Sequence, residues 1–292
     1  MPEEQVEVSH TSPKKEVKKT LELDEIIEIV DDNKYQKERD QFIEQRLTEL
    51  QGVVQPKEFT LFSPPYRGFV HPDSVIKPAA FWDGFKVDDK SIYSDFVDNI
   101  RTFKNHDQWK TKTISEIKPH AILKTIGEYF GNYANYIGLE DRHMEFYTDH
   151  TSGSSESVSL SEHKGRGVAM CTEKSAVAQN LISFLGDSSE LCISKGCEIN
   201  VGKEEKHVFN IISSENGYFI FETSNPVYRK DEEDNIINYL PAIYKITDEQ
   251  YSNLMNGESV LVKHKNQQVI NGKYTNLEGG KRKYGGLDKS NL

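Results

Sequence analysis

Residues 167 to 186, "GVAMCTEKSAVAQNLISFLG", set one thiol between a loop that contains glycine and a short amphipathic helix. From Val177 onward, apolar residues recur at i, i+4 and i+7, the spacing of one helix face, and Gly186 is a typical helix stop. The pattern therefore predicts a helix that begins near Cys171. A residue at a helix start lies beside unpaired backbone N–H groups and the positive end of the helix dipole, which favour a thiolate and bind a developing oxyanion.

A thiolate at this position becomes a catalyst only if a base can hold its proton and return it to a leaving group. His207 begins a strongly apolar strand pattern in the same half of the chain, and Glu222 follows the next apolar strand pattern. The sequence "SENG" between the two patterns has the chemistry of a β-hairpin turn. Because the two ends of a hairpin lie together, we expect Glu222 to reach the imidazole and fix its tautomer.

Each of these three residues also has an ordinary structural interpretation. A cysteine at a helix start is more often an inert buried residue. A histidine at the start of a strand is usually a surface residue or a satisfied one, and an acidic residue after a strand is usually solvated. The order of cysteine on a helix, histidine on a strand and carboxylate on the next strand is much less expected by chance. We therefore favour the catalytic interpretation.

The chain resembles the core of the transglutaminase-like cysteine enzymes, especially their bacterial branch, over about residues 160 to 265. The resemblance lies in the helix segment quoted above and in "KHVFNII" and "GYFIFETSNP". It implies an α+β fold with a papain-like core, in which the helix of the nucleophile packs on an antiparallel sheet. It also implies that Cys171 is the nucleophile, His207 the general base and acid, and Glu222 the orienting carboxylate.

The sequence departs from the family pattern at three places. Glu222 is one methylene longer than the usual aspartate, and Thr172 replaces an aromatic residue that often follows the nucleophile. Three residues stand between Gly167 and Cys171, two more than in the tightest form of the motif. If Glu222 does not serve, Asn225 is the first alternative for the third role. These departures bear on the reaction more than on the fold.

In this superfamily such a triad catalyses acyl transfer through a thioester. The chain has no calcium loop of EF-hand spacing, and we expect hydrolysis of a peptide or amide bond in a protein or peptide substrate, without a cofactor. Protein-glutamine transglutaminase or deamidase activity is one alternative. Another is an arylamine N-acetyltransferase-like activity, because "GRGVAMC" faintly resembles the Arg-Gly-Gly-x-Cys motif of those enzymes. The last is a catalytically degenerate protein that only binds partners.

The other histidines and cysteines do not predict a metal site. His143 and His150 bracket "MEFYTD", but a zinc site there needs two further ligands that the sequence does not supply. Cys192 and Cys197 lie at an odd separation on one predicted strand, which places them on opposite faces if the strand is regular. This arrangement suits one core residue and one surface residue better than a shared metal.

Composition limits the partners and the location of the protein. The chain has 292 residues, a net charge of −11 and a pI near 5.4, so we expect no nucleic-acid partner. No run approaches the roughly 18 apolar residues of a membrane span, and the acidic start "MPEEQVEVSH" does not resemble a secretory leader. Three cysteines are too few for a disulfide framework. We expect a cytoplasmic protein without membrane contact, and its oligomeric state stays open.

The chain divides by composition into four predicted regions. They are a disordered arm over 1–20, a mainly helical region over 21–150, the catalytic core over 151–268 and a mobile tail over 269–292. The serine-rich stretch "TSGSSESVSLS" marks the boundary near residue 151. Within the helical region, the segment 53–90 is rich in proline and aromatic residues, and we expect irregular chain there.

Overall fold

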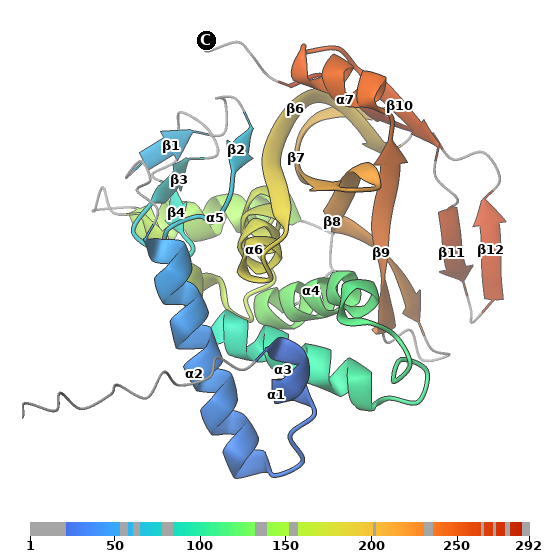
Figure 1. Ribbon diagram of the computed structural model, residues 1–292. Coiled ribbons are helices and arrows are strands. Elements are labelled where there is room, and N and C mark those ends of the chain that lie inside the picture. The colour runs from blue at the N-terminus through green and yellow to red at the C-terminus, as the bar shows by residue number, and fades with distance from the viewer. Residues whose placement is uncertain are drawn as a thin grey trace, which may run out of the picture.

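The structure is a computed structural model with both helices and strands, and most strand pairs in it are antiparallel (Figure 1). The predicted α+β class is confirmed. The residues described are 22–52, 58–60, 65–77, 84–131, 139–151, 157–200, 203–230, 236–263, 266–270, 273–277 and 281–287. The predicted arm over 1–20 lies outside them. Among the described residues, no helix combines the length and the apolar character needed to span a bilayer.

The helices of the first half lie in the region predicted to be mainly helical, 21–150. Asp31 and Thr113 begin two of them as N-caps, because each side chain accepts a backbone N–H three residues later. Pro119 lies inside its helix, at the sixth residue. The helices are α1 (Leu23–Ile27), α2 (Asp32–Gln51), α3 (Ser91–Asn105), α4 (Ile114–Phe130), α5 (Leu139–Thr151), the 3-10 helix η1 (Leu160–His163), α6 (Cys171–Phe184) and α7 (Asp248–Met255).

Two larger sheets and a separate two-stranded pair, β11–β12, are present among the described residues. The seven-stranded sheet has the order β10-β13-β6-β7-β8-β9, with β2 also paired to β6, and all its pairs are antiparallel. The four-stranded sheet has the order β1-β3-β4-β5. The strands are β1 (Glu58–Thr60), β2 (Tyr66–Arg67), β3 (Val75–Lys77), β4 (Phe85–Lys86), β5 (Val158–Ser159), β6 (Ser188–Asn200), β7 (Lys203–Ser214), β8 (Gly217–Lys230), β9 (Ile236–Ile246), β10 (Val260–Lys263), β11 (Asn266–Ile270), β12 (Lys273–Leu277) and β13 (Lys281–Tyr284).

The segment 53–90, expected to be irregular, contains four short strands in its described part. Each has two or three residues: β1 pairs with β3 and β3 with β4 inside the segment, whereas β2 pairs with β6 and β4 with β5 farther along the chain. Proline and aromatic content gives no signal for such short pairings. The prediction of irregular chain is therefore wrong at these strands.

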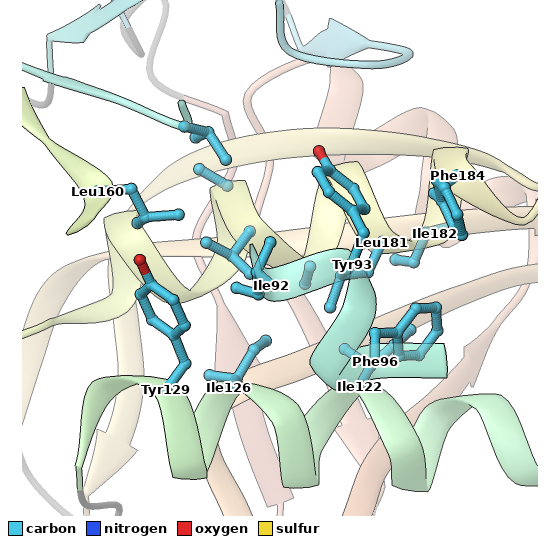
Figure 2. Close-up of a cluster of buried hydrophobic side chains, with 14 of the residues drawn as sticks. Ile92, Tyr93, Phe96, Ile122, Ile126, Tyr129, Leu160, Leu181, Ile182 and Phe184 are labelled. Atoms are coloured by element: carbon cyan, nitrogen blue, oxygen red, sulfur yellow. The ribbon is translucent and has the colours of Figure 1, made fainter. Parts of the chain in front are cut away.

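One hydrophobic core joins the predicted helical region to the predicted catalytic core. It contains buried side chains of α2, α3, α4 and α6 and one face of the large sheet. Figure 2 shows Tyr93 of α3, Ile126 of α4 and Leu181 of α6 meeting in this cluster. The rings of Tyr93 and Phe184 lie 5.0 Å apart. The boundary near residue 151 therefore does not separate two independent cores.

A second cluster fills the opposite face of the large sheet, and it contains both Cys192 and Cys197. The two thiols were expected on opposite faces, but both are fully buried in this cluster. The reason is a β-bulge between Ser194 and Cys197, where Gly196 takes a φ of +64°. The extra residue shifts the alternation of the strand, so an odd separation returns to the same face.

The predicted mobile tail is wrong for its described end. Strand β13 lies between β10 and β6, and Tyr284 is fully buried in the second cluster. The tyrosine hydroxyl donates a hydrogen bond to Glu222. A single aromatic residue in a segment rich in lysine and glycine gives a weak apolar signal, although burying it is worth roughly 1.5–3 kcal/mol. The positions 271–272, 278–280 and 288–292 of that tail lie outside the described residues.

Candidate functional site

The loop before α6 is fixed on the end of α4. The N–H groups of Gly165 and Gly167 donate to the carbonyls of Tyr129 and Phe130 at 2.8 and 2.7 Å. The α4 helix ends at Gly131, where φ is +81° and an added Cβ would lie 2.8 Å from the Gly165 backbone. Only glycine permits this close approach. The α4 end therefore determines where the loop delivers the first residue of α6.

Helix α6 begins at Cys171, as the sequence predicts, and ends before Gly186, whose φ is +86°. Glu173 caps its start, because the Glu173 carboxylate accepts the Met170 N–H at 2.9 Å. Cys171 is partly exposed, whereas all side chains from Thr172 to Phe184 are buried. The thiol is thus the accessible end of a helix that is otherwise enclosed.

Polar side chains fix the register of α6 against the large sheet. The Ser175 hydroxyl lies 3.0 Å from the Val208 carbonyl, and the Asn210 amide donates to the Ser175 carbonyl at 3.1 Å. The same amide donates to Gln179, which in turn bonds to Ser189 on β6. These groups are buried, so a shift of the helix along the sheet would leave several of them without partners. These hydrogen bonds therefore fix the position of the start of α6 along β7.

His207 and Glu222 lie on adjacent strands of the predicted hairpin. The strands β7 and β8 meet at Ser214 and Gly217, in the predicted "SENG" turn, and Asn210 pairs with Phe221. This register makes His207 and Glu222 diagonal neighbours on one face. The imidazole Nε2 lies 2.9 and 2.8 Å from the two carboxylate oxygens. The predicted contact between the two side chains is therefore present.

Cys171 also interacts with the imidazole. His207 is buried, which alone would lower its pKa, but the charge of Glu222 and hydrogen bonds with Cys171 and Glu222 raise the pKa well above 6.5. The shift favours the protonated imidazole. The structure brings together the three residues that the sequence singled out, from the start of a helix and two adjacent strands.

Glu222 has further donors that the sequence did not reveal. Tyr284 donates its hydroxyl proton to Oε2 at 3.1 Å, and the Ser224 N–H donates to Oε1 at 3.3 Å. These hydrogen bonds orient a fully buried carboxylate toward the imidazole. The side chain of Asn225, the alternative third residue, lies outside the described part of the structure.

A buried lysine also belongs to this region, and sequence reasoning missed it. Lys174 is only 3% exposed and stands one helical turn after Cys171. Burial lowers its pKa from 10.5 to about 8, partly offset by the negative charges of Cys171, Glu173 and Glu222. The available signal was a lysine in the first turn of the helix, but a lysine in a helix is usually solvated.

A second polar network supports the start of α6 from the other side. Tyr147 of α5 donates to Glu173 at 2.8 Å and lies 3.0 Å from His163 Nε2. His143 donates through Nδ1 to the Val168 carbonyl at 2.9 Å. Burial alone would raise the Glu173 pKa, but the charges of His143 and His163 and the Tyr147 hydrogen bond lower it. The network therefore favours an ionised Glu173 beside the loop that precedes α6.

His150 and His163 also have polar side-chain partners. His150 lies 2.9 Å from Glu162, and His163 lies 3.0 Å from the Tyr147 hydroxyl. Within the described ranges, no group of three or more His, Cys, Asp and Glu side chains is placed to hold a metal ion. A cavity of about 560 Å³ opens near the other end of α6, with Phe42, Arg46 and Phe184 in its wall. It is not lined by any of the three predicted site residues.

Comparisons of the chain with protein-family models, curated proteins and solved structures found no match.

Proposed function

We propose that this protein is a thiol-dependent acyl-transfer enzyme of the transglutaminase-like type, with a papain-like core, that hydrolyses a peptide or amide bond. One observation carries the proposal: the buried His207 contacts Glu222 through Nε2 and also interacts with the Cys171 thiol at the start of α6. Nucleophile, base and orienting group in this order are what covalent catalysis by a thiol requires.

The reaction begins with the Cys171 thiolate and the His207 imidazolium. Sulfur attacks the substrate carbonyl, a C–S bond forms, and the negative charge moves to the carbonyl oxygen near the N–H groups at the start of α6. His207 then gives its proton to the leaving nitrogen as the C–N bond breaks, which leaves a thioester. Because Glu222 occupies Nε2, the proton moves through Nδ1.

Water completes the cycle. His207, now neutral, removes a proton from the water as its oxygen attacks the thioester carbonyl. The C–S bond breaks, the carboxylic acid leaves, and the thiolate and the imidazolium are restored. Glu222 stays ionised throughout and holds the imidazole in place.

The glutamate in place of aspartate is compatible with this proposal. Its extra methylene does not keep it from the imidazole, because both carboxylate oxygens lie within 2.9 Å of Nε2. An amine in place of water would make the same chemistry a transamidation, and a glutamine side chain as substrate would make it a deamidation. With three free cysteines, we infer a reducing, cytoplasmic setting. The substrate that the resemblance implies is a protein or peptide.

The test is the reactivity of Cys171. We expect iodoacetamide to alkylate it at pH 6 at least tenfold faster than free cysteine, with mass analysis locating the adduct. His207→Ala should abolish the excess reactivity, because the imidazolium no longer stabilises the thiolate. Cys192 and Cys197, both fully buried, serve as internal controls. Alkylation of Cys171 at the rate of free cysteine would refute the proposal.

The acyl class can be read from the same residue. A panel of peptide and amide electrophiles is incubated with the protein, and the mass added at Cys171 identifies the acyl group that it accepts. Peptide or amide adducts that persist in Glu222→Gln and vanish in Cys171→Ala support the proposal. Acetyl transfer from acetyl-CoA would instead favour the N-acetyltransferase alternative.

A further inference from the structure

The last described strand, β13, brings a side chain to the proposed site from across the large sheet. Strands β6 and β7 lie between β13 and β8 in the strand order, yet the Tyr284 hydroxyl reaches Glu222 on β8. In a flat sheet, three strand spacings of about 4.8 Å each would separate the two strands by about 14 Å, more than a tyrosine side chain spans. The sheet therefore curves around the second cluster, and Tyr284 crosses the interior of that cluster.

The position of the Tyr284 ring depends on packing inside this cluster. Tyr284 is fully buried, and its ring centroid lies 5.0 Å from that of Phe209 and 6.4 Å from that of Tyr244. Its hydroxyl donates to Glu222 at 3.1 Å, and the two oxygens of this carboxylate lie within 2.9 Å of His207 Nε2. A displacement of β13 would therefore take the hydroxyl away from the carboxylate that contacts the imidazole.

Two glycines follow Tyr284 and meet the bulge of β6. The strand pairs on either side of them place Gly285 and Gly286 opposite Gly196 and Lys195. A Cβ added to Gly285 would overlap the Lys195 carbonyl oxygen, and the Lys195 N–H donates to the Gly286 carbonyl at 3.3 Å. The extra residue of the bulge thus brings the β6 backbone directly against the glycine pair.

The other side of the glycine pair contacts the end of α7. A Cβ added to Gly286 would overlap the backbone of Gly257, which lies two residues after this helix. The Leu287 N–H donates to the Leu254 carbonyl of α7 at 3.0 Å. Backbone touches backbone on both sides, an approach that only glycine permits. The two glycines therefore fix the depth of the end of β13 between β6 and α7.

We propose that residues 281–287 form a C-terminal clasp that positions Glu222 in the acyl-transfer site. Gly285 and Gly286 fix the clasp against β6 and α7, and Tyr284 supplies the hydroxyl that orients the carboxylate toward His207. The inference rests on the proposed function, because this carboxylate is the third member of the proposed triad. The tyrosine and the two glycines are positioning residues, which act through Glu222.

A clasp that served only stability would behave differently in two respects. Tyr284→Phe keeps the buried ring and removes only the hydroxyl, so a merely structural segment would lose some stability and leave the reactivity of Cys171 unchanged. If the clasp positions Glu222, loss of the hydroxyl and displacement of the glycines impair the same reactivity by the same route. Two changes that act by one route are not additive, whereas independent changes are.

The experiment measures three properties of the full chain. They are the rate of Cys171 alkylation by iodoacetamide from pH 5 to pH 9, the thermal unfolding midpoint, and the NMR signal of the His207 Nε2 proton, assigned by its absence in His207→Ala. The third property reports on the contact with Glu222 without involving the thiol. The variants are Tyr284→Phe, Gly285→Ala, Gly286→Ala and the double variant Tyr284→Phe/Gly285→Ala.

Two controls separate the clasp from general effects. Gly52→Ala is the matched glycine substitution, because Gly52 has a φ of −66° and an added Cβ would lie at an ordinary 3.5 Å from the Glu49 carbonyl oxygen. Val262→Ala removes buried volume from the second cluster on β10 and keeps Tyr284 and both glycines. It therefore lowers the unfolding midpoint without changing the proposed positioning residues.

We expect Tyr284→Phe to react about tenfold more slowly at pH 6, the rate equivalent of one hydrogen bond to a charged group. Gly285→Ala and Gly286→Ala should lose at least as much, and the double variant should react no more slowly than Gly285→Ala. The Nε2 proton signal should move in all four variants. Both controls should keep the wild-type rate and signal.

Wild-type reactivity in Tyr284→Phe overturns the inference. Additive losses in the double variant overturn it too, because the glycines would then act independently of Tyr284. If neither glycine variant folds, the rate and the signal of Tyr284→Phe decide alone, since this substitution keeps the shape of the buried ring.

The outcomes also distinguish this inference from the proposed function. Fast alkylation in the wild type that is lost in His207→Ala but kept in Tyr284→Phe would leave the proposed function standing and remove the clasp from it. Alkylation of the wild type at the rate of free cysteine would refute the proposed function. The Nε2 proton signal of Tyr284→Phe would then still show whether the clasp positions Glu222.

Discussion

Replacing Glu222 with glutamine should destabilise the protein in a way that depends on pH. The substitution keeps the shape of the side chain but removes the charge beside a buried imidazolium. Breaking a buried ion pair by removing one partner costs about 3–5 kcal/mol. The glutamine oxygen can still accept one hydrogen bond, worth about 1 kcal/mol. We therefore expect a loss of about 3 kcal/mol in the free energy of unfolding at pH 6.

The sign of the pH dependence follows from the raised pKa of His207. A group whose pKa is higher in the folded state contributes stability that is complete below its unfolded value, near 6.5. This contribution disappears as the pH rises through the folded value. Because Glu222 is the largest cause of the increase, Glu222→Gln removes most of the contribution. The difference between variant and wild type should thus be largest at pH 6 and smaller at pH 9.5.

Urea unfolding at pH 6 and pH 9.5 measures this difference. The comparison is made in a Cys171→Ala background, since the thiol also raises the His207 pKa. Glu190→Gln is the matched control: Glu190 is buried on β6 and accepts hydrogen bonds from Arg67 and Tyr251 rather than from histidine. Its loss should be the same at both pH values. An equal loss at the two pH values for Glu222→Gln would refute the reasoning.

Three further results are expected. Tyr284→Phe should lower the free energy of unfolding by about 1 kcal/mol and slow acylation of Cys171, since Glu222 loses a donor; unchanged acylation would exclude β13 from the site. Tyr147→Phe leaves buried Glu173 without its hydroxyl donor and should cost about 1–3 kcal/mol in urea unfolding, unlike Tyr218→Phe on an exposed ring stack. Lys174→Met should be more stable than the wild type by up to about 3 kcal/mol below pH 8, because burial lowers the Lys174 pKa from 10.5 to about 8. This gain in the free energy of unfolding should vanish as the pH approaches 10.5. A gain independent of pH would contradict an origin in the buried ammonium.

The sequence was sufficient where the determinants are local. The periodicity after Cys171 and the stop at Gly186 define α6, and the "SENG" turn defines the β7–β8 hairpin. Because a hairpin fixes its own register, the contact between His207 and Glu222 could also be foreseen. The interaction of the thiol with the imidazole depends on helix packing, but the position of Cys171 at the helix start already restricts it.

The sequence was insufficient where the determinants are distant contacts. Tyr284 reaches Glu222 only because β13 inserts between two strands formed earlier in the chain. The bulge at Gly196 turned two cysteines to one face, and no alternation rule anticipates an extra residue. Lys174 is buried only because helices and sheet enclose α6 on all sides. A helix periodicity cannot distinguish such a lysine from a solvated one.

The position of β13 in the chain affects how the protein matures during synthesis. Tyr284 is added by the ribosome 62 residues after Glu222, and the nascent polypeptide emerges in that order. A growing chain that has released α6 and the β7–β8 hairpin therefore already carries the sulfur and the imidazole, but its carboxylate still lacks the tyrosine donor. The contact that orients Glu222 from β13 therefore forms only after translation has passed this point.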